Sequence, residues 1–124
     1  MQPNQPHQIS RAARRVYYDG ACPVCRREIA WYRSRRGGGD VDWVDLTQAA
    51  LPPGLDRAAM MKRFTVERAD GAMVSGAAGF VALWRALPAT GLLGRMVDNR
   101  AAIWVLERAY RGFLSIRGMW RSAP

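Results

Sequence analysis

The two cysteines of this chain, Cys22 and Cys25, form a Cys-Pro-Val-Cys motif between a segment typical of a strand and a segment typical of a helix. Residues 14 to 19 are rich in β-branched and aromatic side chains, which favour a strand, and the Asp-Gly pair that follows favours a turn. Pro23 then takes the position where a helix tolerates proline best, its first turn. We therefore expect a strand, a turn and a helix start, with the cysteines at the helix N-terminus.

This arrangement makes Cys22 the N-cap residue and places Cys25 within the first helical turn. The free N–H groups and the positive end of the helix dipole at that point favour a thiolate over a thiol. Arg26 and Arg27 add positive charge nearby. We expect Cys22 to be the exposed nucleophile, and Cys25 to be more buried and to act as the resolving thiol.

Two other interpretations of the cysteine pair stay open. A structural disulfide is typical of a secreted protein, but residues 1 to 15 lack the apolar segment of a signal peptide. A zinc site needs four ligands, whereas the chain offers two cysteines and one histidine, His7, in a tail expected to be mobile. A metal site shared between two copies of the chain would supply the missing ligands. Redox use is favoured because a C-x-x-C motif beside a strand–helix–strand pattern is typical of thioredoxin-like proteins.

The length of 124 residues and the hydrophobic content of 49% predict one domain with its own core. No apolar run is long enough to cross a membrane. The formal net charge is +9, but the arginines are scattered from Arg11 to Arg121 with no nucleic-acid-binding motif behind them. We therefore expect no nucleic-acid ligand, whereas contact with an acidic partner or a peripheral anionic surface is compatible with the charge.

The spacing of apolar residues and turn residues predicts the order of the elements. It predicts strand 14–19, helix 23–34, strand 41–46, a short helix 56–63 capped by Asp56, strands 64–68 and 72–75 joined by a turn at Asp70-Gly71, a helix from Gly76 to Leu87, and a final helix capped by Asp98 or Asn99. Phe80 and Trp84 are expected to point inward. The final helix carries one apolar stripe, which is typical of a core-facing surface, made of Ile103, Leu106, Tyr110, Phe113 and Leu114.

The crossover helix between the first two strands makes them parallel, whereas the tight turn makes the last two antiparallel. We therefore predict an α/β, thioredoxin-like fold, with a four-stranded mixed sheet flanked by helices and a C-terminal helical extension. Residues 1–13 are expected to form a disordered leader and residues 14–120 a single domain. The cysteine motif would lie at the carboxyl end of the first strand, where open α/β sheets place their chemistry.

The stretch from Tyr18 to Cys25 reads Tyr-Asp-Gly-Ala-Cys-Pro-Val-Cys and resembles the Asp-Gly-x-Cys-Pro-x-Cys signature of the DCC family of thiol-disulfide oxidoreductases. The later Asp-Gly turn and Gly76 are also similar to that family's pattern, so the resemblance covers residues 14 to 120. It implies a thioredoxin-like fold, Cys22 and Cys25 as the redox pair, and Asp19 as the family's acidic residue.

Three further positions complete the predicted site. Asp19 could take the proton of Cys25 during resolution, or its side chain could only accept a backbone hydrogen bond in the turn. Thioredoxins and glutaredoxins carry a cis-proline before the third strand, and here Thr65 stands at about that place, with no proline in residues 61 to 66. We expect Pro23 and Thr65 to contact the substrate.

Together these features predict a cytoplasmic thiol-disulfide oxidoreductase that needs no cofactor and holds no metal. Its partners would be a disulfide-containing protein or a small thiol, and an external reductant that recycles the cysteine pair. The alternative is a non-enzymatic interaction module in which the cysteine pair ligates a metal across a dimer.

Overall fold

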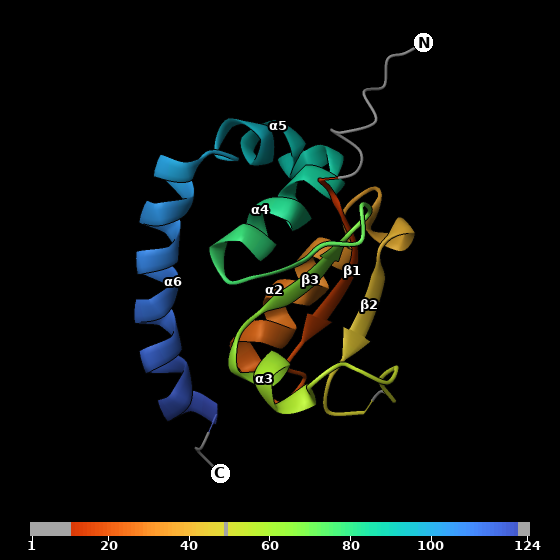
Figure 1. Ribbon diagram of the computed structural model, residues 1–124, viewed down its shortest axis with the longest axis vertical. Helices are drawn as coiled ribbons and strands as arrows, with labels where there is room; N and C mark the ends of the chain where they lie inside the picture. Colours follow the sequence, from red (N-terminus) through yellow and green to blue (C-terminus); the bar gives the residue numbers. More distant parts are fainter. Residues whose placement is uncertain (1–10, 49, 122–124) are drawn as a thin grey trace.

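The computed structural model describes residues 11–48 and 50–121, except for the side chains of residues 118–121. The strands are β1 Ala13–Tyr18, β2 Asp42–Asp45, β3 Thr65–Arg68 and β4 Met73–Ser75. The helices are α2 Pro23–Arg33, α3 Arg57–Lys62, α4 Ala77–Ala86, α5 Pro88–Met96 and α6 Arg100–Arg121, with a short 3-10 helix, η1, at Gly38–Asp40. The predicted strands and helices occur in the predicted order, and η1 and α5 are additional elements (Figure 1).

The four strands form one mixed sheet in the order β2-β1-β3-β4. Strand β1 runs parallel to β2 and antiparallel to β3, and β3 pairs antiparallel with β4. The β3–β4 turn contains Gly71 with a φ of 90°, a left-handed conformation that glycine adopts without steric cost. The sheet and its covering helices make the predicted thioredoxin-like α/β fold, and the prediction is confirmed.

Both faces of the sheet are buried. Adjacent residues of a strand point to opposite faces, and the neighbours Val16 and Tyr17 of β1 are 0% and 2% exposed. Val16 belongs to a core with Ile29 of α2 and Leu83 of α4. Tyr17 belongs to a second core with Met60 of α3. Helices α2 and α4 therefore cover one face and α3 covers the other, at the end of the sheet where β1 runs into α2 (Figure 1).

The folded chain begins earlier than expected. Residues 11–13 were expected to belong to the leader, but β1 begins at Ala13 and the Ala12 carbonyl accepts a hydrogen bond from Ala69 N–H. Arg11 also donates two hydrogen bonds of 2.7 and 2.6 Å to the carboxylate of Asp98. These contacts to residues distant in sequence fix the start of the strand. Residues 1–10, including His7, lie outside the described residues.

The ends of the later helices follow local rules. The predicted stop of α4 before Pro88 is confirmed, and Pro88 then occupies the first turn of α5. Of the two predicted caps of α6, Asn99 is the one observed, because its Oδ1 accepts the N–H of Ala102 at 2.9 Å. Asp98 instead pairs with Arg11 and Arg85. No helix in the described part of the chain has the length and apolar character needed to span a membrane.

Helix α6 lies outside the core and packs along α4 (Figure 1). Tyr110 is the one buried member of the predicted apolar stripe, and the other four residues are half-buried. The inward orientation predicted for Phe80 and Trp84 is only partly correct. Both are half-buried, whereas Val81 and Leu83 of the same helix are buried. Phe80 and Trp84 line the space between α4 and α6 because α6 covers α4 at its edge.

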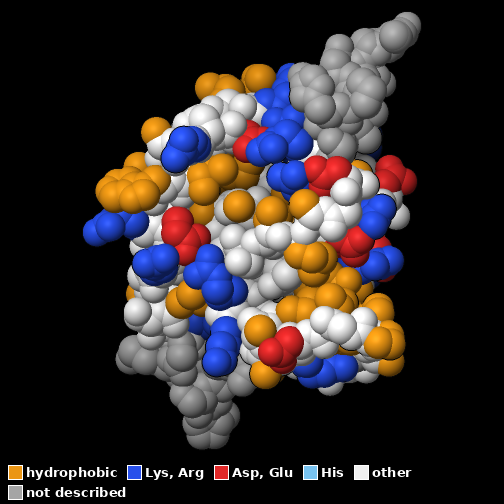
Figure 2. Space-filling model, in the orientation of Figure 1, with side chains coloured by type: hydrophobic (Ala, Val, Ile, Leu, Met, Phe, Trp, Pro, Cys, Tyr) orange, Lys and Arg blue, Asp and Glu red, His pale blue; other side chains and the backbone are white. Residues whose placement is uncertain are grey.

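Basic side chains are spread over the surface rather than gathered in one patch on the face drawn in Figure 2, where they alternate with acidic and hydrophobic ones. Several are held in ion pairs. Arg63 and Arg111 both pair with Glu107, and Arg68 pairs with Asp70. These arginines therefore pair with carboxylates at separate sites on the surface.

Candidate active site

The N-terminus of α2 has the predicted geometry. Cys22 is the N-cap residue, and its Sγ accepts a hydrogen bond from Cys25 N–H at 3.3 Å. Pro23 stands in the first turn, as expected. The Asp19 carbonyl accepts the N–H of Cys22 at 3.2 Å, and the Asp19 carboxylate accepts the N–H of Ala21 at 3.0 Å. The turn between β1 and α2 is therefore fixed by backbone and side-chain hydrogen bonds.

Gly20 is required in this turn because the chain passes close to the end of β2. A Cβ atom at Gly20 would overlap the carboxylate of Asp45. Asp45 itself accepts hydrogen bonds from the N–H and hydroxyl of Thr47 at 2.9 and 2.6 Å. The glycine of the Asp-Gly pair thus allows the backbone to pass close to Asp45 just before the cysteines.

The burial of the two cysteines is the reverse of the prediction. Cys22 is 0% exposed, whereas Cys25 is half-buried, so the expectation of an exposed Cys22 and a more buried Cys25 is wrong. The N-cap geometry sets the direction of the Cys22 sulfur, and packing over the start of α2 accounts for its burial. The Cys22 sulfur turns back toward the first N–H groups of the helix and away from solvent, whereas Cys25, one turn later, faces a cavity.

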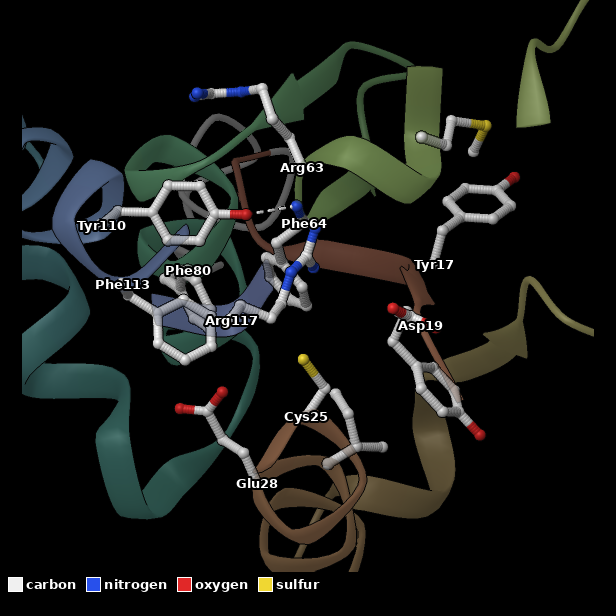
Figure 3. A pocket seen from close by; sticks show the side chains of 13 residues that line it. Tyr17, Asp19, Cys25, Glu28, Arg63, Phe64, Phe80, Tyr110, Phe113 and Arg117 are labelled. Atoms are coloured by element: carbon white, nitrogen blue, oxygen red, sulfur yellow. Dashed lines mark hydrogen bonds between the residues drawn. The ribbon is translucent and has the colours of Figure 1, made fainter. Parts of the chain in front are cut away.

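This cavity has a volume of about 20 Å³, enough for one water molecule. Its lining comes from β1, α2, α3, α4, α6 and the segment before β3. Figure 3 shows the Cys25 sulfur and the Arg117 guanidinium reaching into the same space, with the Glu28 carboxylate beside Phe113. Asp19 also lines the cavity and is 4% exposed. The cavity lining therefore contains one thiol, two carboxylates and two arginines, Arg63 and Arg117.

Helix α6 supplies side chains that sequence analysis did not assign to the site. Tyr110 Oη accepts the N–H of Phe64 at 2.6 Å. Arg117 Nη2 donates to the carbonyls of Met61 and Lys62 at 3.0 and 3.1 Å. Tyr110 lies on the apolar stripe, and Arg117 follows it by two turns on the same side. The stripe was interpreted only as a packing surface, although its spacing was the signal that could have located these residues.

The cavity strongly disfavours ionisation of Cys25. Burial, and after it a hydrogen bond with the Cys22 sulfur, raise the pKa of the Cys25 thiol to about 12. Arg117 opposes this shift through a hydrogen bond and its positive charge. Cys25 therefore remains a thiol at neutral pH and can donate its S–H to Cys22, while Arg117 is the group that favours the Cys25 thiolate.

Glu28 lies one turn after Cys25 on α2 and lines the same cavity. Part of the side chain reaches solvent, but the carboxylate sits beside Phe113 (Figure 3). Burial there raises the pKa of Glu28 above its ordinary value. A carboxylate whose pKa is raised binds a proton more tightly than an ordinary glutamate, which suits an acid–base group.

The other predicted site residues lie in different surroundings. Pro23 is exposed at the start of α2 and is not part of the cavity lining. Thr65 is 8% exposed, and its hydroxyl donates to the Arg63 carbonyl at 3.0 Å. The residues before it, Arg63 and Phe64, line the cavity instead. The structure thus brings Cys25 and Asp19 together at the cavity, but not Pro23 or Thr65.

Comparison with known protein families agrees with this geometry. The family model for DCC1-like thiol-disulfide oxidoreductases matches residues 16–123. The chain belongs to this family. The match confirms the predicted resemblance and supports a general redox role, and it extends from the cysteine motif through α6. No curated protein and no solved structure matched the chain. Among the described residues, no three His, Cys, Asp or Glu side chains form a group that could hold a metal ion.

Proposed function

We propose that this DCC1-like protein catalyses thiol–disulfide exchange with Cys22 and Cys25 as its redox pair. The observation that carries the proposal is the hydrogen bond from Cys25 N–H to Cys22 Sγ at the N-terminus of α2. That position favours a thiolate, and the family match supports redox chemistry. The raised pKa of Cys25 supports a division of roles between the two sulfurs.

In the first step the Cys22 thiolate attacks one sulfur of a substrate disulfide. The substrate S–S bond breaks, a mixed disulfide forms at Cys22, and the other substrate sulfur leaves as a thiolate. Cys25 N–H donates a hydrogen bond to the attacking Cys22 sulfur. Because Cys22 is fully buried, the residues that cover it must move when substrate binds.

In the second step Cys25 loses its proton and attacks the Cys22 sulfur, which releases the second substrate thiolate and leaves a Cys22–Cys25 disulfide. Arg117 stabilises the Cys25 thiolate. Glu28 is proposed as the proton acceptor because its pKa is raised. Asp19 lines the same cavity, but its carboxylate already accepts the N–H of Ala21, which supports its role as a turn residue.

The cycle transfers two electrons from the dithiol to the substrate and needs no cofactor. An external thiol or reductase returns the pair to its reduced form. The substrate is a disulfide-containing protein or a small disulfide, and the reducing cytoplasm is the compartment in which such a cycle is expected.

A matched pair of variants tests the assignment of the two sulfurs. Reduced Cys25→Ser and Cys22→Ser proteins are mixed with a disulfide substrate, and covalent adducts are identified by mass spectrometry without reductant. We expect a stable mixed disulfide at Cys22 in Cys25→Ser and little adduct in Cys22→Ser. Adducts only in Cys22→Ser would show that Cys25 is the nucleophile. Stoichiometric metal in anaerobically purified protein, with no adduct in either variant, would favour the interaction-module alternative.

A further inference from the structure

An apolar groove of about 360 Å³ lies between α2, α4 and α6, next to the cysteine cavity. Glu28, Phe80, Tyr110 and Phe113 line both the groove and the cavity. The groove is therefore the neighbour of the cavity that Cys25 faces. A ligand in the groove would lie against side chains that also line the Cys25 cavity.

The walls of the groove present hydrocarbon rather than hydrogen-bonding groups. Trp84 Nε1 donates to Tyr32 Oη at 2.9 Å, and Tyr110 Oη accepts the N–H of Phe64 at 2.6 Å. The polar ends of these two rings are thus engaged with the protein. Val24 of α2 and Leu106 of α6 add aliphatic surface. Among the described residues, Glu28 is the one carboxylate that lines the groove, and no Lys or Arg lines it.

We propose that the groove binds the uncharged, apolar substituent of a small disulfide and so orients the disulfide for the cysteine pair. This inference rests on the proposed function and names its substrate class. The volume of the groove falls at the lower end of the range for small-molecule pockets. Burial of apolar substituent against the groove favours binding. A carboxylate inside the groove would lie beside Glu28, while Arg63 and Arg117 line the cavity and not the groove, so an anionic substituent is disfavoured in the groove.

The reaction is written for a disulfide R–S–S–R whose R group occupies the groove. The Cys22 thiolate forms a mixed disulfide with one sulfur and releases R–S⁻. Cys25 then closes the Cys22–Cys25 disulfide and releases the second R–S⁻, which takes up a proton. The substrate gains two electrons and the protein dithiol loses two. An external thiol supplies the electrons for the next cycle.

The test compares two chromogenic disulfides in single-turnover reactions with the pre-reduced protein. Dithiodipyridine is uncharged at neutral pH, and dithiobis(nitrobenzoate) is dianionic. Ala109 lines the groove at an exposed position of α6, so Ala109→Phe fills it with little strain. Ala101 is exposed on the same helix outside the groove lining, and Ala101→Phe is the matched control.

We expect Ala109→Phe to slow the first thiol release from dithiodipyridine about tenfold, and Ala101→Phe to leave that rate unchanged. Ala109→Leu, which fills less of the groove, should give a smaller decrease. Glu28→Gln should lower the ratio of the dithiodipyridine rate to the dithiobis(nitrobenzoate) rate several-fold, because the dianion no longer meets a carboxylate in the groove. The ratio is used because it cancels any change in thiol chemistry common to both reagents.

Equal rates in Ala109→Phe and Ala101→Phe would overturn the inference while leaving the proposed function intact. The same conclusion would follow if a protein disulfide such as insulin reacted faster than dithiodipyridine and were unaffected by Ala109→Phe. Failure of the wild-type protein to react with any disulfide would instead refute the proposed function itself.

Discussion

The N-terminus of α2 and the helix α6 both contribute to the cavity, but the hydrogen bonds that hold them in place join residues at very different separations in the sequence. The hydrogen bond between Cys25 and Cys22 spans 3 residues. The bond from Phe64 to Tyr110 spans 46 residues, and that from Arg117 to Met61 spans 56. The start of α2 thus carries the proposed redox pair, whereas α6 lines the cavity and places Arg117 near Cys25.

The largest effects should follow changes at α2. Either Cys22→Ser or Cys25→Ser should abolish multiple turnover, because each variant lacks one of the two sulfurs needed to complete the cycle. Turnover is measured as reduction of a chromogenic disulfide in the presence of excess thiol reductant. Turnover that persisted in Cys25→Ser would mean that the reductant resolves the mixed disulfide directly, and that the environment created by α6 has no kinetic role.

The next largest effect on the reaction should come from Glu28, which lines the cavity between the N-terminus of α2 and α6. Glu28→Gln should slow resolution of the mixed disulfide about 100-fold through loss of its proton acceptor, while attack by Cys22 is less affected. Asp19→Asn should change resolution less than about twofold, because Asn Oδ1 can accept the same N–H from Ala21. Stopped-flow measurement separates the two steps, and the reverse order of effects would assign the proton to Asp19.

Anchoring of α6 should make a measurable contribution to stability. Tyr110→Phe removes the acceptor of Phe64 N–H, so we expect the free energy of unfolding to fall by about 1–3 kcal/mol. Urea denaturation followed by circular dichroism measures the change. An unchanged unfolding midpoint would show that this hydrogen bond does not hold α6 against the segment before β3.

The smallest effect should be found at the turn between α5 and α6. A hydrogen bond from Arg11 lowers the pKa of Asp98. A lowered folded-state pKa stabilises the fold above the ordinary pKa of about 4, and this contribution is lost as the pH falls through the folded-state pKa. We expect Asp98→Asn to lower the free energy of unfolding by about 1 kcal/mol at pH 7. The difference between variant and wild type should shrink in acid, and a constant difference would contradict the assignment.

The elements that the sequence predicted correctly are those that depend on neighbouring residues. The strand, turn and helix around Cys22, the Asp56 cap of α3 and the Asp70-Gly71 hairpin all follow from local propensities and hydrogen bonds. Their spacing also identified the fold, because the crossover helix and the tight turn determine which strands are parallel.

The errors concern side chains whose surroundings depend on the packing of distant elements. The burial of Cys22 depends on what covers the start of α2, and local capping rules do not describe that. The stripe on α6 predicted a packed surface but not which groups it would meet, so Arg117 was missed. The substrate contact of Thr65 was assigned by analogy of position and stays a prediction, whereas Arg63 and Phe64 line the cavity.

The central claim is that an arginine of α6 controls ionisation of a cysteine on α2. The most direct test is the pH dependence of mixed-disulfide resolution in wild type, Arg117→Gln and Arg108→Gln. Arg108 is exposed on the same helix and stacks on Trp104 instead, so it is the matched control. Because Arg117 lowers the pKa of Cys25, Arg117→Gln should move the rise in rate to higher pH and slow resolution about tenfold at pH 7, with no shift in Arg108→Gln. Superimposable pH profiles for the three proteins would contradict the account.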